Sequence, residues 1–171
     1  MIGARAVGGD LTAVVMLSLW LGAAIVVAAV VAPAAFAVLP TRTLAGALVG
    51  RVLPTLFWSG ALVGFVVALL SRARTQGGAR LVSVLALALA CLAAQLGVAP
   101  RIERVRVTAG GPLDALPRDD VRRATFGRLH AISVALLGVA SLAGAAALVL
   151  TMRALPTARA SEGLSTPLHE R

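Results

Sequence analysis

Charged residues are scarce in this sequence, and their scarcity argues against a soluble domain. Only 13% of the 171 residues are charged, and the mean hydropathy is +0.94. A soluble domain would keep about a quarter of its residues charged to cover its surface. A medium other than water must therefore cover most of this chain.

Cysteine, histidine and lysine are also rare or missing. Cys91 is the only cysteine, so no disulfide can form within the chain. One of the two histidines, His169, lies in a polar tail, which leaves a membrane haem without its second histidine ligand. Met16 and His130 are separated in depth by roughly 16 Å and cannot share a copper ion. We therefore expect no metal and no cofactor.

Lysine is absent, so the net charge of +9 comes from arginine alone. These arginines lie in loops, at termini and at helix ends, where they can meet anionic lipid head groups. We therefore expect the lipid bilayer, and not a nucleic acid, as the partner of this charge. No phosphate-binding glycine loop, HExxH motif or paired nucleophile occurs, so the sequence predicts no enzyme.

Four long apolar runs dominate the chain. Each has about the ~20 residues that a helix needs to cross ~30 Å of hydrocarbon, and none contains Asp, Glu, Lys, Arg or His. The stretch 63–70 is apolar on every face, which favours helices over alternating barrel strands. The sequence therefore predicts an all-α integral membrane four-helix bundle with both termini on one side. The runs are 11–38, 52–70, 81–99 and 132–152.

We expect one transmembrane domain over 11–152, between an N-terminal segment 1–10 and a flexible polar tail 153–171. Its predicted helices cover about 11–38, 51–70, 81–99 and 127–152, with Asp10 as the first N-cap and Pro100 ending the third. The first run exceeds a secretory apolar region of about 7–15 residues, which favours a membrane helix over a cleaved signal.

A short interfacial helix is predicted between the third and fourth spans. Pro117 suits a first helical position, and Asp119 and Arg123 have the spacing of an i,i+4 ion pair. Within the second span, Gly60 and Gly64 form a GxxxG pair. Small residues at this spacing let membrane helices approach closely, so we expect helix packing there.

The candidate site lies at the membrane end opposite the termini. His130 is the leading candidate, because an ionisable residue at membrane depth indicates function. Gln95 is expected to face it at similar depth, and Glu103 could pair with Arg101 or Arg128. The cluster is either a ligand, ion or proton site or a set of interfacial residues that fix helix ends. A solvent-accessible cavity reaching His130 and Gln95 would favour a transporter, and dry packing there would favour a scaffold.

Several stretches resemble a known family. They are LWLGAAIVVAAVVAPAAFAVLP, TLAGALVGRVLPTLFWSGALVG, APRIERVR and RRATFGRLHAISVALLG, within residues 17–150. They are similar to the four-helix membrane proteins typified by vertebrate transmembrane protein 205 and to bacterial counterparts with a domain of unknown function. The chain is also more distantly similar to copper-resistance D-type membrane proteins, but the metal-binding His and Met residues of those proteins are not matched in this sequence. The resemblance implies a four-helix bundle and supplies no catalytic residue.

Two functions remain open at this point. The first is a non-enzymatic membrane component or scaffold, acting as a homo-oligomer or with another membrane protein. The alternative is a small ion or solute transporter with a site near His130. The arginine-rich and lysine-free composition favours a bacterial origin, so we expect a multi-pass protein of the bacterial inner membrane.

Overall fold

The computed structural model describes residues 2–72 and 78–155, with side chains from 7–71 and 78–155. The described part contains helices and no strand, and four of its helical stretches are long and apolar enough to cross a membrane. The predicted all-α four-helix membrane fold is thereby confirmed. The elements are α1 (Ile2–Val26), η1 (Val27–Val31), α2 (Ala32–Val38), α3 (Arg42–Arg72), α4 (Gly78–Leu92), η2 (Ala93–Val98), α5 (Ala99–Ala109), η3 (Leu113–Ala115) and α6 (Val121–Ala154).

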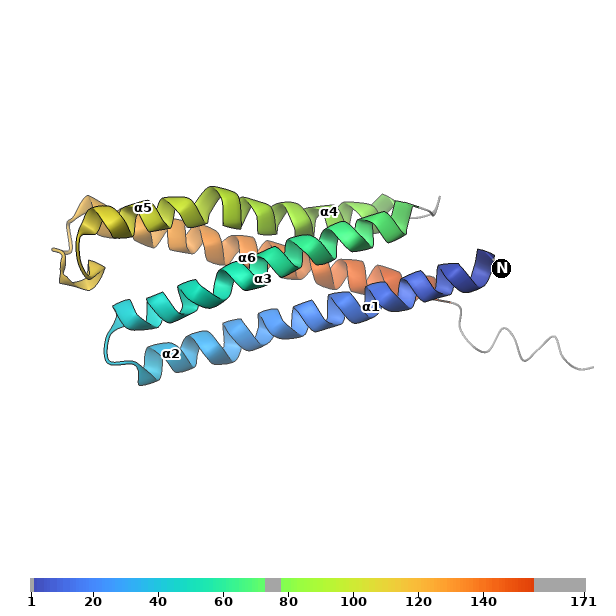
Figure 1. Cartoon of the computed structure of the whole chain (residues 1–171), viewed down its shortest axis with the longest axis horizontal. Coiled ribbons are helices and arrows are strands. Elements are labelled where there is room, and N and C mark those ends of the chain that lie inside the picture. The colour runs from blue at the N-terminus through green and yellow to red at the C-terminus, as the bar shows by residue number, and fades with distance from the viewer. Residues whose placement is uncertain (1, 73–77, 156–171) are drawn as a thin grey trace, which may run out of the picture.

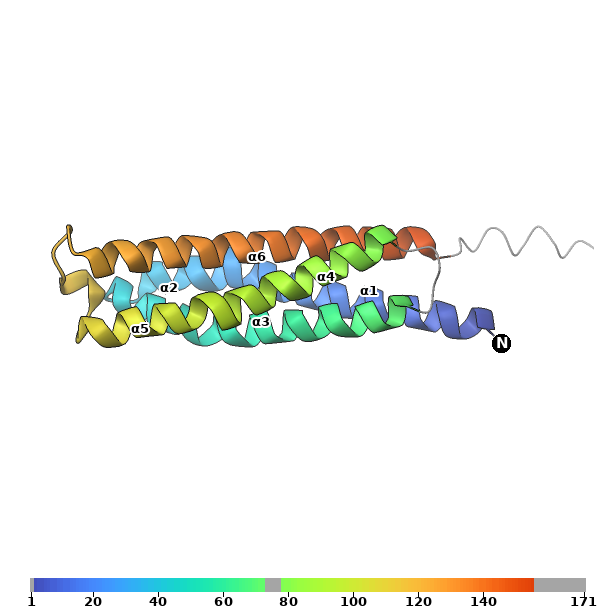
Figure 2. The same ribbon diagram turned by 90° about the horizontal axis from the view of Figure 1, so that it is seen from above.

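The four stretches run roughly side by side along the long axis of the molecule (Figures 1 and 2). The start of α1 and the end of α6 lie at the same end, which we call the termini end. The opposite end carries the connections 39–41 and 110–120, and we call it the loop end. This arrangement follows from an even number of spans with short connections.

The core is built around the indole of Trp20. Its Nε1 donates a hydrogen bond of 2.9 Å to the carbonyl of Leu56, which joins α1 to α3. A Cβ added to Gly60 would lie 2.7 Å from both this ring and the Sγ of Cys91. A Cβ on Gly64 would lie 2.8 Å from a backbone oxygen of α4. The two glycines therefore mark the places where α3 comes too close to its neighbours to carry a side chain.

The first helix begins earlier than the predicted residue 11, and Asp10 is not its N-cap. Asp10 lies inside α1, where its Oδ1 is 2.7 Å from the Nη1 of Arg80 on α4. Both residues are buried. The ion pair between α1 and α4 explains why Asp10 is not an N-cap. The buried carboxylate is paired with the guanidinium of Arg80 and does not need the backbone N–H groups at a helix start.

The third span does not end at Pro100, contrary to expectation. It continues through α5 to Ala109, and Pro100 lies directly after the wide turn of η2. The N–H of Ala99 bonds to the carbonyl of Ala94, five residues back. Pro33 follows η1 in the same way, since Ala32 bonds back to Val27. The wider turns shift the hydrogen-bond register and make room for each proline ring.

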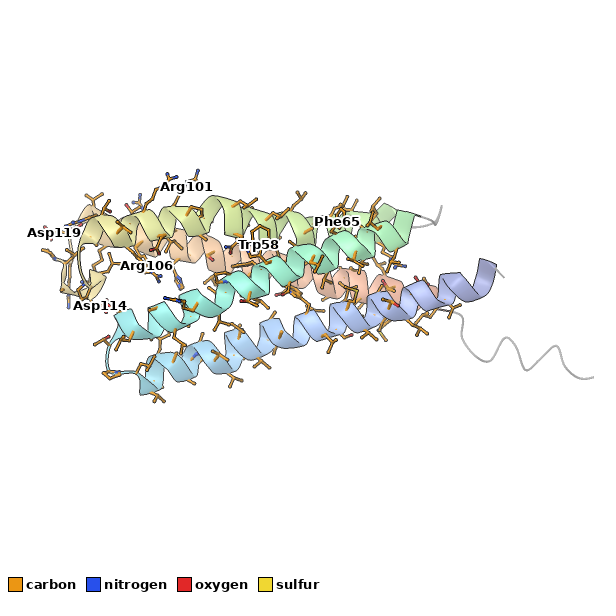
Figure 3. All side chains as sticks on the ribbon, in the orientation of Figure 1. Trp58, Phe65, Arg101, Arg106, Asp114 and Asp119 are labelled. Carbon is orange, nitrogen blue, oxygen red and sulfur yellow. The ribbon has the colours of Figure 1, made fainter. Side chains whose placement is uncertain are left out.

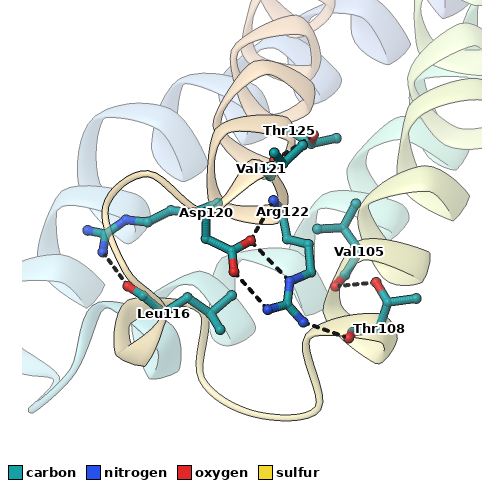
Figure 4. A network of polar contacts seen from close by, with 8 residues as sticks. Val105, Thr108, Leu116, Asp120, Val121, Arg122 and Thr125 are labelled. Atoms are coloured by element: carbon teal, nitrogen blue, oxygen red, sulfur yellow. Dashed lines mark hydrogen bonds and ion pairs between the residues drawn. The ribbon is translucent and has the colours of Figure 1, made fainter.

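The second and fourth helices also begin earlier than predicted, at Arg42 and Val121 in place of about 51 and 127. The predicted helix at Pro117 is therefore wrong in position. The short turn between α5 and α6 is η3, and Asp120 caps α6 by accepting from the N–H of Arg122 at 2.8 Å (Figure 4). Arg123 bonds to the carbonyl of Leu116 and not to Asp119.

Candidate functional site

The bundle separates into two arms at its loop end. From the termini end to the middle of the bundle α1 packs on α6, and Gly144 faces Trp20 and Leu21. Beyond η1 the chain packs on α3 through a second small core of Ala35, Ala45 and Val49. We call α2 with residues 42–54 of α3 the first arm, and residues 99–133 the second arm. Figure 1 shows the two arms diverging toward the loop end.

A cavity of about 700 Å³ lies between the arms. Its outer part, near the loops, carries the charged side chains, whereas Phe57 and Ala94 at its inner end also belong to the main core. The charged lining residues therefore lie toward the loop end, and the inner end is apolar apart from Gln95 and Ser133. The polar and ionisable lining residues are Arg42, Thr43, Gln95, Glu103, Arg106, Asp114, His130 and Ser133.

Two hydrogen bonds cross the cavity mouth. The Nη2 of Arg106 donates to the carbonyl of Gly46 at 3.2 Å, and the Oγ1 of Thr43 donates to the Oδ2 of Asp114 at 2.9 Å. Figure 3 shows Arg106 on the side of α5 that faces α3. Gly50 leaves the space for this guanidinium, because a Cβ there would lie 3.2 Å from Nη1. These contacts hold the arms together while leaving the cavity between them.

An aromatic ring lies against the guanidinium of Arg106. The guanidinium carbon of Arg106 lies 5.6 Å from the ring centroid of Phe126, within the range of a cation–π interaction. The ring of His130 stacks on Phe126, with centroids 6.3 Å apart and planes 8° from parallel. Arg106, Phe126 and His130 therefore form one stack along the wall of the second arm.

The structure brings together three of the five predicted site residues. His130, Gln95 and Glu103 all line the cavity. Gln95 comes from η2, and its Oε1 is buried without a hydrogen-bond partner.

The other two predicted residues lie elsewhere. Arg101 and Arg128 are exposed and do not line the cavity. The Nη1 of Arg101 donates to the carbonyl of Gly97 in its own stretch of helix, and Figure 3 shows Arg101 on the far side of α5 from Arg106. In the described part of the chain no ion pair joins Glu103 to an arginine.

Sequence reasoning missed Arg106. The signal was present, because Arg106 follows Glu103 by three residues and shares its helix face. It could be used only with the knowledge that the helix continues past Pro100. Within the described residues, no group of three His, Cys, Asp or Glu side chains is placed to hold a metal ion.

Comparison with known proteins identifies one family. The family described as "Domain of unknown function (DUF4149)" matches residues 15–110, more than half of the chain. The matched region contains the second half of α1 and all of α2 to α5, including Gln95, Glu103 and Arg106. No curated protein and no solved structure matches.

Proposed function

The chain belongs to the DUF4149 family, and on this basis we propose that it is a non-enzymatic, multi-pass membrane component that binds a small ligand between its two arms. The cavity is the observation that carries the proposal. Its volume of about 700 Å³ lies within the range of small-molecule sites. Such sites combine apolar walls with a few polar groups, as this one does.

Binding accounts for the geometry better than passage through the bundle does. The inner end of the cavity meets the main core, in which Leu17 and Leu87 are fully buried and Trp20 is 3% exposed. A transported solute would have to displace this packing. Transport near His130 therefore stays the second candidate, supported by the position of that side chain on the cavity wall.

A purely structural scaffold would need no cavity at this end, since closely packed arms would hold the helix ends equally well. Assembly with a second copy or another membrane protein remains compatible with a ligand site. The bacterial inner membrane and the likeness to the transmembrane protein 205 group stay predictions.

Native mass spectrometry of the protein purified in mild detergent tests the proposal. We expect the wild type to retain a non-covalent adduct and Gly46→Leu to lose it. Gly46 lines the cavity, and a Cβ there meets no atom within 4 Å, so the new side chain fills space without a backbone clash.

Gly138→Leu is the matched control. Gly138 is exposed on α6 away from the cavity, and a Cβ added to it would also meet nothing within 4 Å. An adduct retained equally by all three proteins, or by none, would contradict a ligand site in this cavity.

A further inference from the structure

We propose that the ligand is an amphiphile from the bilayer whose polar end carries both a phosphate and a primary ammonium group. This inference rests on the proposed function and names the ligand class for the same cavity. Its starting point is the order of the lining, with the charged side chains at the loop end and an inner end that is apolar apart from Gln95 and Ser133. A lipid has the same order, since its head lies at the interface and its chain points to the midplane.

Arg106 provides the site for the phosphate. Its guanidinium is partly buried and contacts a backbone carbonyl and an aromatic ring, both of them neutral. A neutral carbonyl leaves the positive charge uncompensated, and a guanidinium binds phosphate oxygens in a bidentate geometry. Arg42, at the start of α3, adds a second positive charge to the same cavity.

Glu103 provides the site for the ammonium. It lies one turn before Arg106 on α5 and lines the same cavity. Asp114 adds a second carboxylate, which accepts a hydrogen bond from Thr43. Two arginines and two carboxylates therefore face the cavity, and a purely anionic head would meet the repulsion of both acids. A zwitterionic head is complementary to both signs.

The separation of the arms supports entry from the lipid phase. α2 packs on η1 and α3, whereas α1, which precedes η1, packs on α6. Phe36 of α2, which is 48% exposed, and His130 of α6 line the cavity from its two arms. An acyl chain can therefore lie between the arms without first leaving the bilayer.

Binding of three single-chain lipids with the same acyl chain tests the inference on the purified protein. The probes are lysophosphatidylethanolamine, lysophosphatidylcholine and lysophosphatidylglycerol, followed by native mass spectrometry. We expect the ethanolamine lipid to bind about tenfold more tightly than the other two, because choline has no N–H to donate and glycerol has no positive charge. Water-soluble phosphoethanolamine should not displace it, since it lacks the chain.

Three variants assign the contacts. Glu103→Gln should abolish the preference for ethanolamine over glycerol, and because Glu103 is exposed the fold should tolerate it. Arg106→Gln should weaken all three lipids about tenfold. Arg104→Gln removes the same charge from an exposed position on α5 outside this cavity, and should leave affinities and their order unchanged.

Equal affinity for the three lipids, equal losses in Arg104→Gln and Arg106→Gln, or displacement by phosphoethanolamine would each overturn the inference. If Gly46→Leu removes an adduct that is not zwitterionic, this inference fails while the proposed function stands. If the wild type carries no adduct and binds no probe, both fail.

Discussion

Gly60 lies against Trp20 so closely that a single methyl group on the glycine would collide with the indole. The Cβ position is 2.7 Å from the Nε1 of the ring, which itself bonds to the carbonyl of Leu56. The hydrogen bond between α1 and α3 therefore depends on the missing side chain at position 60. Because this contact lies near the centre of the bundle, it sets how closely three helices can approach.

Gly60→Ala should lower the stability of the protein in detergent by about 1–3 kcal/mol, the usual cost of overpacking a core. The expected sign is informative, because Gly→Ala within a helix otherwise stabilises by roughly 0.5–1 kcal/mol. Gly138→Ala is the control, since nothing lies within 4 Å of the position its Cβ would take. Thermal unfolding of both variants measures the difference. Similar melting temperatures would show that position 60 is not tightly packed.

The buried pair of Asp10 and Arg80 should be strongly coupled. Both side chains are almost fully buried, and Arg80→Gln leaves the carboxylate without this partner 2.7 Å away. We expect a loss of about 3–5 kcal/mol, as for other broken buried ion pairs. The double variant Asp10→Asn/Arg80→Gln should lose less than the sum of the single variants. Chemical or thermal unfolding of the four proteins gives the coupling, and additive losses would argue against it.

Arg101→Gln serves as a reference for that experiment. Arg101 is exposed and bonds only within its own stretch of helix, so its loss should change stability by less than about 0.5 kcal/mol. A loss as large as that of Arg80→Gln would mean that removal of any arginine destabilises the purified protein.

Asp120 should make stability depend on pH in the acid range. Its hydrogen bonds to the side chain and backbone N–H of Arg122 lower the pKa of the carboxyl from 3.8 to about 2 (Figure 4). A lowered pKa means that the charged form stabilises the folded state. The contribution is therefore complete above about pH 4 and disappears as the pH falls toward about 2. Melting temperatures measured from about pH 5 to about pH 2 should fall less steeply in Asp120→Asn than in the wild type. Parallel curves would exclude this carboxyl as a contributor.

Water should reach the cavity wall but not the core on the same face of α6. Ser133 lines the cavity with 7% of its surface exposed, whereas Ala140, two turns further on, has no exposed surface and lies in the main core. On a Cys91→Ala background, a charged thiol reagent should modify Ser133→Cys at least roughly tenfold faster than Ala140→Cys, because the thiol at position 133 borders the cavity whereas the thiol at position 140 is enclosed by the core. Gly46→Leu should slow the reaction at position 133. Equal rates at the two positions would indicate a closed, dry contact between the arms.

The sequence by itself determined the medium, the number of spans and the fact that the first span begins at the same end of the bundle at which the last span ends. An apolar run of about 20 residues in a bilayer forms a membrane-spanning helix, because every backbone hydrogen bond must then be made within the segment. The same reasoning placed His130, Gln95 and Glu103 at one end of the bundle, and the structure places all three on one cavity. The rise per residue of a helix is constant, so the depth of a residue in the membrane follows from its position within the apolar run.

The tertiary structure decided which residues at that depth face one another. Arg101 and Arg106 are five residues apart on the same stretch of helix, yet one points outward and the other into the cavity. Their orientation depends on the wide turn of η2, which lets the helix continue past Pro100 with a shifted register. Rotation about a helix axis is set by packing against neighbours and by such local changes of register. Asp10 shows the same limit, because it resembles a helix cap in sequence and becomes a buried ion-pair partner only when α4 brings Arg80 to within 2.7 Å.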